Sequence, residues 1–471
     1  MDKVQLIDIL SKYNQEHLLR FWDELSESDR CQLRQDILEL DLAETKLYFS
    51  KAMEGLGNKQ LLKERISPIP SEAISSYRDI SPEKVQHYEE LGLKEISEGR
   101  VAVILMAGGQ GTRLGMTNPK GMCDVGLPSS KTLFCLQAER IRSLQNIVEK
   151  KFGIRSKIMW YILTSEATDQ PTIEYFQANN YFGLDEENVK MFKQGMLPCF
   201  TLDGKIILDK KYQISKAPDG NGGLYRALKV QGILDDMKIR GIRSVHVHSV
   251  DNILIKVADP VFIGYCLSRS ADCGVKVLGK SSPTEAVGIV CQVDGEYHVV
   301  EYSEIPLEIA QLRNNDGQLL FNAANICNHY FTVDFLYEIG HNCETNMELH
   351  AAKKKIPYVD DNGVKCTSTI PNGIKIEKFI FDVFKFSTYF AALEVKREYE
   401  FSPVKNSDSV GNDCPSTARK DLLNLHRTWL LNSGAASVKG DVEVSPLISY
   451  AGENLTEIVQ GKDFEGPLTL K

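Results

Sequence analysis

The sequence predicts an α/β fold built on a doubly wound, mixed sheet. From residue 99 onward, short apolar segments typical of buried strands alternate with longer segments of helical periodicity. The apolar segment 101–106 runs directly into a glycine-rich loop, as strands of buried parallel sheets often do. The chain has 471 residues, 42% of them hydrophobic and 25% charged, which is enough for a large core and for more than one domain.

The expected elements follow in order along the chain. Apolar residues at helical spacing predict a helical scaffold over residues 1–98, with Ser26 and Asp29 at capping-box spacing and Ser81 and Pro82 at a second helix start. We find no chemistry in this region. Strands are expected at 101–106, 158–163, 243–250 and 286–293, and helices near 131–149, 172–180, 222–237, 258–270 and 416–432.

Three parts follow from this pattern. We expect an N-terminal helical region over residues 1–98, an α/β domain over 99–400 and a small β-rich C-terminal domain over 401–471. Right-handed crossovers between parallel strands make a doubly wound, Rossmann-like sheet the natural architecture of the middle part.

The composition excludes several classes of protein. A net charge of −9 argues against a nucleic-acid partner, and no apolar run approaches the ~18 residues of a membrane span. The N-terminus lacks the layout of a signal peptide. The eleven cysteines are scattered without a Cys-x-x-Cys pair, so we expect a cytoplasmic protein with reduced thiols.

Residues 105–120 are the most informative stretch of the chain. The loop after the strand at 101–106 contains four glycines and two basic residues, Arg113 and Lys120. Without a Cβ atom, glycines allow backbone N–H groups to converge on an anion, and the two cations supply the positive charge. The loop therefore predicts a phosphate site at the carboxyl end of a strand.

Two common phosphate-binding motifs do not describe this loop. Its spacing differs from that of the P-loop, and the P-loop string that occurs at 274–281 has strand-like spacer residues, so we interpret it as a chance match. The dinucleotide fingerprint, counted from Gly109, fails because its third glycine position holds Leu114.

Asp251 lies at the carboxyl end of the strand expected at 243–250. Its carboxylate would face the same sheet edge as the glycine loop and could hold Mg²⁺ against phosphate oxygens, although a solvated Asp that caps a turn would have the same position. His246 and His248 also suggest a metal, but strand alternation places them on the face opposite Asp251. We interpret both histidines as structural.

The other candidate motifs are weaker. Residues 218–223 form a second glycine cluster before a helix, where Asn221 could bind an amide or a hydroxyl, but Asp-Gly and Asn-Gly are also strong turn formers. Gln194 could pair with a pyrimidine edge or be a surface residue. Glu301 and Glu304 are ordinary edge carboxylates unless a sugar lies beside them, and 379–384 is first a core stripe and second a ligand platform.

Taken in order, these motifs resemble those of the eukaryotic UDP-N-acetylhexosamine pyrophosphorylases. The loop pattern Gly-Gly-x-Gly-Thr-Arg-Leu followed by Pro-Lys is typical of sugar-nucleotide pyrophosphorylases, and the resemblance extends from about residue 90 to residue 452. Its other matching strings lie at 194–198, 217–225, 250–253, 283–285, 287–288, 300–304, 322–326, 371–374, 379–381, 402–405 and 445–452.

The resemblance implies a GT-A-like nucleotidyltransferase fold. It also implies the reaction UTP + N-acetylglucosamine 1-phosphate ⇌ UDP-N-acetylglucosamine + pyrophosphate, with Mg²⁺ or Mn²⁺. Attack on the α-phosphate would be in line and would need no enzyme nucleophile, so positioning and charge neutralisation would carry catalysis.

The resemblance also assigns roles to single residues. The triphosphate would be held by Arg113, Lys120 and Lys405, the metal by Asp251, uracil and ribose by Gly108, Gly109, Gln194 and Gly220, and the hexosamine by Asn221, Gly288, Glu301, Asn325, Phe379 and Phe381. One departure is Ala324, where the family usually has Gly, and its methyl group could alter the fit of the acceptor.

Two alternatives remain open at this stage. A UDP-glucose or broad UDP-sugar pyrophosphorylase shares the glycine loop, although the strings at 221–225 and 379–381 favour N-acetyl sugars. A catalytically silent sugar-nucleotide sensor would not require Arg113, Lys120, Asp251 and Lys405 together. The expected partners are small-molecule substrates, and the expected assembly is a monomer or a homodimer. The sequence does not indicate which of the two epimers of the N-acetyl sugar is preferred.

Overall fold

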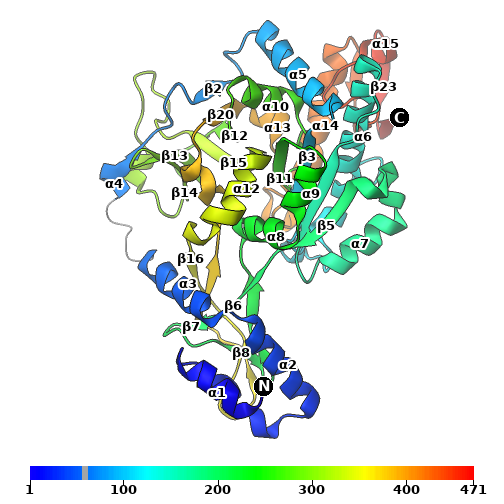
Figure 1. The fold of residues 1–471 in the computed structure, drawn as a ribbon. Coiled ribbons are helices and arrows are strands. Elements are labelled where there is room, and N and C mark those ends of the chain that lie inside the picture. The colour runs from blue at the N-terminus through cyan, green and yellow to red at the C-terminus, as the bar shows by residue number, and fades with distance from the viewer. Residues whose placement is uncertain (56–61) are drawn as a thin grey trace. The chain divides into compact units, whose positions relative to one another are not determined.

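The computed structural model describes residues 1–55 and 62–471 (Figure 1). Contacts divide the chain into two compact units. The larger unit contains residues 63–193, 227–343 and 383–471, and the smaller contains 1–62, 194–226 and 344–382. Each unit thus joins segments that are distant in the sequence, and the boundaries expected at 98/99 and 400/401 stay a prediction.

A mixed sheet forms the centre of the larger unit. Its main path runs β2-β20-β12-β15-β11-β3-β4-β5, with β13, β14 and β1 attached beside β15. β15 is antiparallel to β11 and β12, whereas the other neighbours on this path are parallel. The strands are β1 Ile66–Ser67, β2 Ile74–Ser76, β3 Val101–Met106, β4 Met159–Thr164, β5 Val189–Lys193, β11 Ser244–Ser249, β12 Cys273–Gly279, β13 Ile289–Val293, β14 Glu296–Val300, β15 Ala323–Thr332 and β20 Phe390–Val395.

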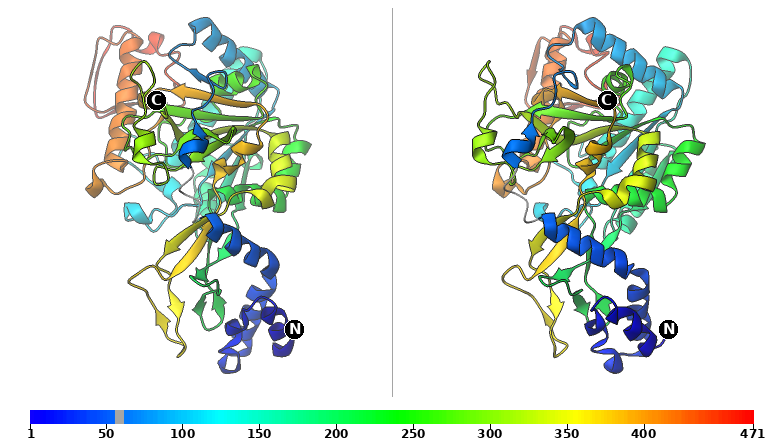
Figure 2. Two further views of the ribbon diagram at one scale, coloured as in Figure 1. Left: turned by 90° about the vertical axis from the view of Figure 1, so that its left-hand side faces the viewer. Right: turned by 60° about the vertical axis from the view of Figure 1, so that its left-hand side comes forward.

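Helices cover both faces of this sheet (Figures 1 and 2). On one face Val103 and Trp160 pack in a core with Phe134 of α6. On the other, Tyr161 donates a hydrogen bond of 2.6 Å to Asp236 of α9. The doubly wound arrangement predicted from the sequence is therefore confirmed. The helices are α5 Pro82–Ser97, α6 Leu133–Phe152, α7 Asp169–Ala178, α8 Leu224–Val230, α9 Ile233–Ile239, α10 Pro260–Ser268, α11 Leu307–Ala310, α12 Val333–Glu338, α13 Arg397–Glu400, α14 Pro415–Asn432 and α15 Thr456–Val459.

Two glycines let α5 and α10 pack backbone against backbone. A Cβ atom on Gly264 would lie 1.7 Å from the carbonyl oxygen of Tyr88, and one on Gly92 would lie 2.0 Å from that of Pro260. Neither carbonyl can move without shifting its helix. This contact requires glycine at both positions.

We expect Gly264→Ala to destabilise the protein by about 2–3 kcal/mol, since overpacking a rigid contact forces a backbone shift. Thermal or denaturant unfolding measures the effect. The matched control is Gly279→Ala, because an added methyl group there meets only Glu394 Oε1 at 3.5 Å. Equal stability of the two variants would contradict close helix packing.

Among the described residues, the smaller unit combines the N-terminal helices with four small sheets. Its core joins Leu18, Leu33 and Tyr48 from the helices to Phe200 and Ile374 from the strands. The pairings are β6 with β10, β8 with β9, and β16 with β19 and β7, and β17 pairs with β18. The bounds are α1 Lys3–Ser11, α2 Glu27–Glu39, α3 Leu42–Gly55, β6 Met196–Pro198, β7 Phe200–Thr201, β8 Leu208–Lys210, β9 Gln213–Ile214, β10 Lys216–Pro218, β16 His350–Lys354, β17 Tyr358–Val359, β18 Lys365–Cys366 and β19 Gly373–Glu377, and α4 Leu62–Arg65 follows at the junction.

Most expected elements are present, with three corrections. Ser26 and Ser81 cap their helices as predicted, accepting hydrogen bonds from Asp29 and Lys84 N–H. The segment 66–71, whose prolines interrupt the helical pattern in the sequence, contains β1, and residues 74–76 of the region expected to be helical form β2. The helix expected over 222–237 is divided into α8 and α9 at Gly232, whose φ is +67°. Only 442–444 of the β-like segment at 442–450 forms a strand, β22.

The C-terminal segment, orange to red in Figure 2, has its own small core. Parallel pairs join β21 (Ser437–Lys439) to β23 (Asp463–Glu465) and β22 (Val442–Val444) to β24 (Leu468–Leu470). Tyr450 donates a hydrogen bond of 3.0 Å to the carbonyl of Val257, which ties this segment to the rest of the larger unit. Among the described helices, none has the length and apolar character that a membrane crossing requires.

Candidate active site

The glycine loop and Asp251 leave the sheet side by side. β3 and β11 are parallel neighbours whose last residues, Met106 and Ser249, are paired in register. From β3 the chain continues outward to β4 and β5, and it then returns to β11 on the other side of β3. Such a reversal of strand order is where open α/β sheets bind ligands. The strand-end placement predicted for both motifs is thus confirmed.

Three charged residues gather at this edge. Lys120 Nζ lies 3.9 Å from Asp251 Oδ2, and both side chains are largely buried. The charges of Asp251 and Lys405 both interact electrostatically with the thiol of Cys327, so Lys405 lies near this edge as well. Burial, reinforced by Asp251, raises the pKa of this thiol to about 12, so it stays protonated at neutral pH.

The glycine loop itself is folded back but open to a ligand. Lys120 N–H donates to the carbonyl of Gly109 at 3.3 Å, and Gln110 pairs with Pro119. Within residues 1–55 and 62–471, no heavy atom other than those of Gly109 and its two chain neighbours lies within 4 Å of the position that a Cβ atom on Gly109 would take. Arg113 is exposed in the 3₁₀ turn Thr112–Leu114 and makes no ion pair within residues 1–55 and 62–471. It therefore forms no ion pair with Asp251.

Asn252, which sequence reasoning missed, fixes the segment that carries Lys405. Its side-chain amide donates to the carbonyl of Glu400 at 2.7 Å and accepts from Ser402 N–H at 3.0 Å. The carbonyl of Asp251 accepts from Val404 N–H at 2.9 Å. These hydrogen bonds hold the segment that carries Lys405 beside Asp251, the candidate metal ligand.

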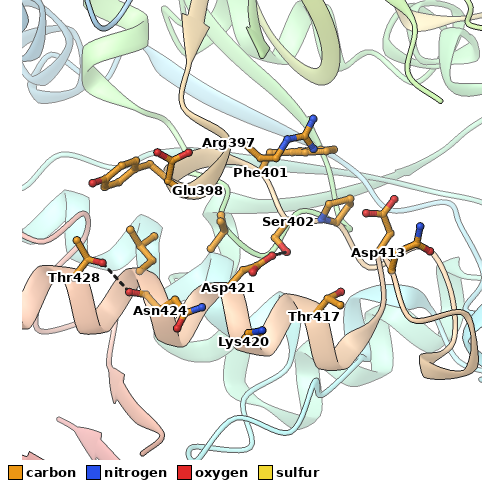
Figure 3. Close-up of a pocket in the computed structure, with 15 residues that line it drawn as sticks. Arg397, Glu398, Phe401, Ser402, Asp413, Thr417, Lys420, Asp421, Asn424 and Thr428 are labelled. Carbon is orange, nitrogen blue, oxygen red and sulfur yellow. Dashed lines mark hydrogen bonds between the residues drawn. The ribbon is translucent and has the colours of Figure 1, made fainter. Parts of the chain in front are cut away.

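A cavity of about 510 Å³ lies between the segment at 397–403 and α14 (Figure 3). Asp421 of α14 reaches the hydroxyl of Ser402, which donates to it at 2.7 Å. On the opposite wall the guanidinium of Arg397 lies over the ring of Phe401 at 5.7 Å. These contacts support the 401–405 segment from the side facing α14.

Three of the predicted sugar-binding residues are close together in the larger unit. Asn325 N–H donates to the carbonyl of Gly288 at 2.9 Å. A Cβ atom on Gly288 would lie 3.0 Å from Glu301 Oε1, so a larger residue would displace that carboxylate. Ala324 is fully buried in the hydrophobic core. Its methyl group therefore faces the core, and any effect on acceptor fit would act through the packing of β15.

In the structure His246 and His248 have structural roles and the P-loop string at 274–281 is a chance match, as interpreted from the sequence. His246 accepts a hydrogen bond from Ala258 N–H through Nδ1, and its Nε2 pairs with Asn328. Burial lowers the pKa of His246 to about 4 and that of His248 to about 3. The spacer of the P-loop string at 274–281 lies in β12.

In the smaller unit, the second glycine cluster wraps around the backbone of Lys378. Lys378 N–H donates to the carbonyl of Asp219 at 2.8 Å, and Lys378 C=O accepts from Gly222 N–H at 2.9 Å. Asn221 Oδ1 accepts from Ile380 N–H at 2.9 Å. Asn221 is therefore placed beside the 379–381 segment, where the rings of Phe379 and Phe381 are 5.2 Å apart. The predicted glycine turn and aromatic pair are thus neighbours.

Asp219 is a buried carboxyl group behind this turn. It is 3% exposed, and its Oδ1 has no hydrogen-bond partner among the described residues. Desolvation raises its pKa from the ordinary 3.8 to about 6. Cβ atoms on Gly195 and Gly223 would lie 2.5 and 1.9 Å from its oxygens. The carboxyl group of Asp219 therefore leaves no room for a side chain at Gly195 or Gly223. Gln194 precedes Gly195 in the chain and so lies close to the turn.

This carboxyl group makes the stability of the protein depend on pH. The folded state keeps its proton up to about pH 6 and the unfolded chain releases it near 3.8, so stability falls as pH rises between these values. We expect Asp219→Asn to remove this loss, and the Tm difference in favour of the variant to grow between about pH 4.5 and about pH 7 by the equivalent of roughly 2 kcal/mol. A difference that is constant with pH would contradict it.

His350 and Asp382 support Phe379 from behind. The ring of His350 stacks on that of Phe379 with centroids 4.2 Å apart, and its Nε2 lies 3.1 Å from Asp382. Asp382 also accepts from Phe379 N–H at 2.8 Å. Glu348 completes a group whose ligand atoms lie within 4.8 Å of one another in the part of the chain that the structure describes. The hydrogen bonds to Asp382 account for the arrangement without an ion.

A mixed sheet with a glycine-rich loop and a carboxylate at its switch point is an arrangement typical of nucleotide-binding α/β proteins, and the comparisons place the chain in the nucleotidyltransferase class. The family model described as UTP--glucose-1-phosphate uridylyltransferase matches residues 44–461. The chain belongs to the UDP-N-acetylhexosamine pyrophosphorylases of this family.

Relatives and solved structures agree with this assignment. The chain is 49% identical to a human protein named UDP-N-acetylhexosamine pyrophosphorylase-like protein 1, over 98% of this chain and 96% of the relative. It is 44% identical to the UDP-N-acetylglucosamine pyrophosphorylase of Saccharomyces cerevisiae, over 96% of both. The crystal structure of the uridine diphosphate N-acetylglucosamine pyrophosphorylase from Trypanosoma brucei in complex with an inhibitor superposes with a TM-score of 0.84 at 30% identity, covering 97% of this chain and 94% of that one.

Proposed function

We propose that this chain is a uridylyltransferase that forms UDP-N-acetylglucosamine and pyrophosphate from UTP and N-acetylglucosamine 1-phosphate. The observation that carries the proposal is the joint presence, at the β3–β11 switch point, of the open glycine loop, Lys120 and Asp251. Relatives named UDP-N-acetylglucosamine diphosphorylase in Arabidopsis thaliana and UDP-N-acetylglucosamine pyrophosphorylase in Saccharomyces cerevisiae support it.

The reaction needs charge neutralisation rather than a nucleophile. A phosphate oxygen of the sugar phosphate attacks the α-phosphorus of UTP, and the bond to pyrophosphate breaks in line. We propose that Arg113, Lys120 and Lys405 offset the charge of the triphosphate. Cys327 has a protonated thiol and the buried histidines are neutral, which agrees with the absence of a covalent step.

Asp251 fits a hard divalent cation such as Mg²⁺ or Mn²⁺. It offers carboxylate oxygens at the anion-binding edge, and such ions are commonly held by one or two carboxylates together with substrate phosphates. The cation, when bound, would screen the phosphate charge. Lys120 beside Asp251 then provides a second, fixed positive charge.

We propose that each unit contributes residues that select the substrates. In the larger unit Gly288, Glu301 and Asn325 would bind the sugar, and Gly108 and Gly109 the nucleotide. In the smaller unit Gln194 and Gly220 would bind the nucleotide, and Asn221, Phe379 and Phe381 the N-acetyl sugar. We further propose that the protein works in the cytoplasm, since all eleven cysteines are free. We also propose that it acts as a monomer or a homodimer.

An acceptor panel tests the function. Pyrophosphate release is measured with UTP, Mg²⁺ and, in turn, N-acetylglucosamine 1-phosphate, N-acetylgalactosamine 1-phosphate and glucose 1-phosphate. We expect the N-acetyl sugars to react much faster than glucose 1-phosphate. Equal rates would favour a broad UDP-sugar pyrophosphorylase, and no release with any acceptor would favour a nucleotide-sugar sensor.

A further inference from the structure

We infer that helix α3 positions the glycine turn at 219–223, with the Tyr48 hydroxyl as the atom that joins them, so that Tyr48 is a positioning residue for hexosamine binding. The inference rests on the proposed function of Asn221 and Phe379. It gives the N-terminal helices a role beyond that of a scaffold.

The first step is the coupling of Lys378 to the turn. Its N–H and C=O hydrogen-bond Asp219 and Gly222, at 2.8 and 2.9 Å. A Cβ atom on Gly220 would lie 2.3 Å from the carbonyl oxygen of Lys378, so the two backbones are in close contact. Phe379 follows directly in the chain. A shift of Lys378 would therefore move both the turn and the aromatic pair.

The second step is the anchoring of the Lys378 side chain to α3. This lysine is only 2% exposed, and its Nζ donates to Tyr48 Oη at 3.0 Å and pairs with Glu344. Nζ also lies 4.5 Å from the centre of the Tyr48 ring. A buried ammonium group without these partners would be costly.

The third step is the anchoring of the other end of the turn. Tyr225 donates to the carbonyl of Ile380 at 2.6 Å, and the next residue, Arg226, donates to Tyr48 Oη at 2.7 Å. Arg226 also binds Glu44 at 2.8 Å and Glu344 at 3.0 Å. Both ends of the turn thus reach the same hydroxyl.

The Tyr48 hydroxyl has its full set of hydrogen bonds. It donates to Glu44 at 2.8 Å and accepts from Arg226 and Lys378, one donor and two acceptor sites in all. Two cations and two carboxylates surround it, so the buried network has no net charge. Charge-assisted bonds of this kind hold a geometry more firmly than neutral ones.

Tyr48→Phe tests the inference, because it removes only this hydroxyl. We expect the KM for N-acetylglucosamine 1-phosphate to rise about tenfold, as for the loss of a hydrogen bond to charged groups, with the KM for UTP and kcat within about twofold. Glu44→Gln, at the partly exposed edge of the network, should act in the same direction by about threefold. The matched control is Tyr13→Phe, a half-buried tyrosine on the same core whose hydroxyl makes no hydrogen bond within residues 1–55 and 62–471.

A double variant separates positioning from general destabilisation. If Tyr48 acts mainly through the turn, Tyr48→Phe should raise the acceptor KM of an Asn221→Ala enzyme by much less than tenfold. An unchanged acceptor KM in both single variants, or an effect that adds fully to that of Asn221→Ala, would overturn the inference. Wild-type enzyme inactive with every N-acetylhexosamine 1-phosphate would instead overturn the proposed function.

Discussion

Asp251→Asn is expected to lower kcat by about 10³-fold, the largest effect in this chain. The substitution keeps the shape of the side chain but removes the charge that would hold a divalent cation, and the Lewis-acid contribution of such a cation is worth several kcal/mol. It also leaves Lys120, 3.9 Å away, without its carboxylate partner. Initial rates of pyrophosphate release with saturating substrates measure the loss.

Binding of Mn²⁺ by the enzyme in the presence of UTP gives a second measurement. Asp251→Asn should weaken it strongly, whereas Asn252→Asp, one residue further on, should leave cation binding in place and disturb the 400–402 segment. A variant at position 251 with near-normal kcat and near-normal Mn²⁺ binding would reduce this residue to a turn former.

The sequence predicted best what local patterns encode. A buried parallel strand has a continuous apolar run, and β3 begins and ends where that run does, at 101 and 106. The reversed strand β15 was not predicted. It contains polar residues, and its register with β12 shifts around Cys327, whose φ is +54°. A bulge of this kind interrupts the strand pattern on which sequence reasoning relies.

In the candidate site, too, the sequence predicts the residues that follow strands but not the contacts between distant positions. Lys120 and Asp251 both follow strands, so topology alone brings them together. Tyr48 and Lys378 are 330 residues apart, and an ion-pair network between such distant positions leaves no periodic signal in either segment. In the sequence Lys378 directly follows Glu377 and lies close to Lys375, so nothing in this charged segment marks it as a buried cation.

Arg113→Ala is expected to lower kcat by about 10²–10³-fold, the usual loss for one donor that stabilises transition-state charge. The structure gives this expectation a specific basis. Arg113 is exposed in the glycine loop, without an ion-pair partner within residues 1–55 and 62–471, so its charge is available to a ligand. An arginine that served only to anchor the loop would instead bind a carboxylate or a carbonyl of the protein.

Steady-state kinetics with UTP and N-acetylglucosamine 1-phosphate measures the effect, and Arg155→Ala is the matched control because Arg155 is exposed outside the loop. Arg113→Lys should recover part of the rate, since a lysine keeps the charge but lacks the planar fork that suits phosphate. If Arg113→Ala raised the KM for UTP without lowering kcat, the arginine would bind the ground state and the transition state equally well. Near-normal values of both constants would leave Lys120 and Lys405 as the cations that act on the triphosphate.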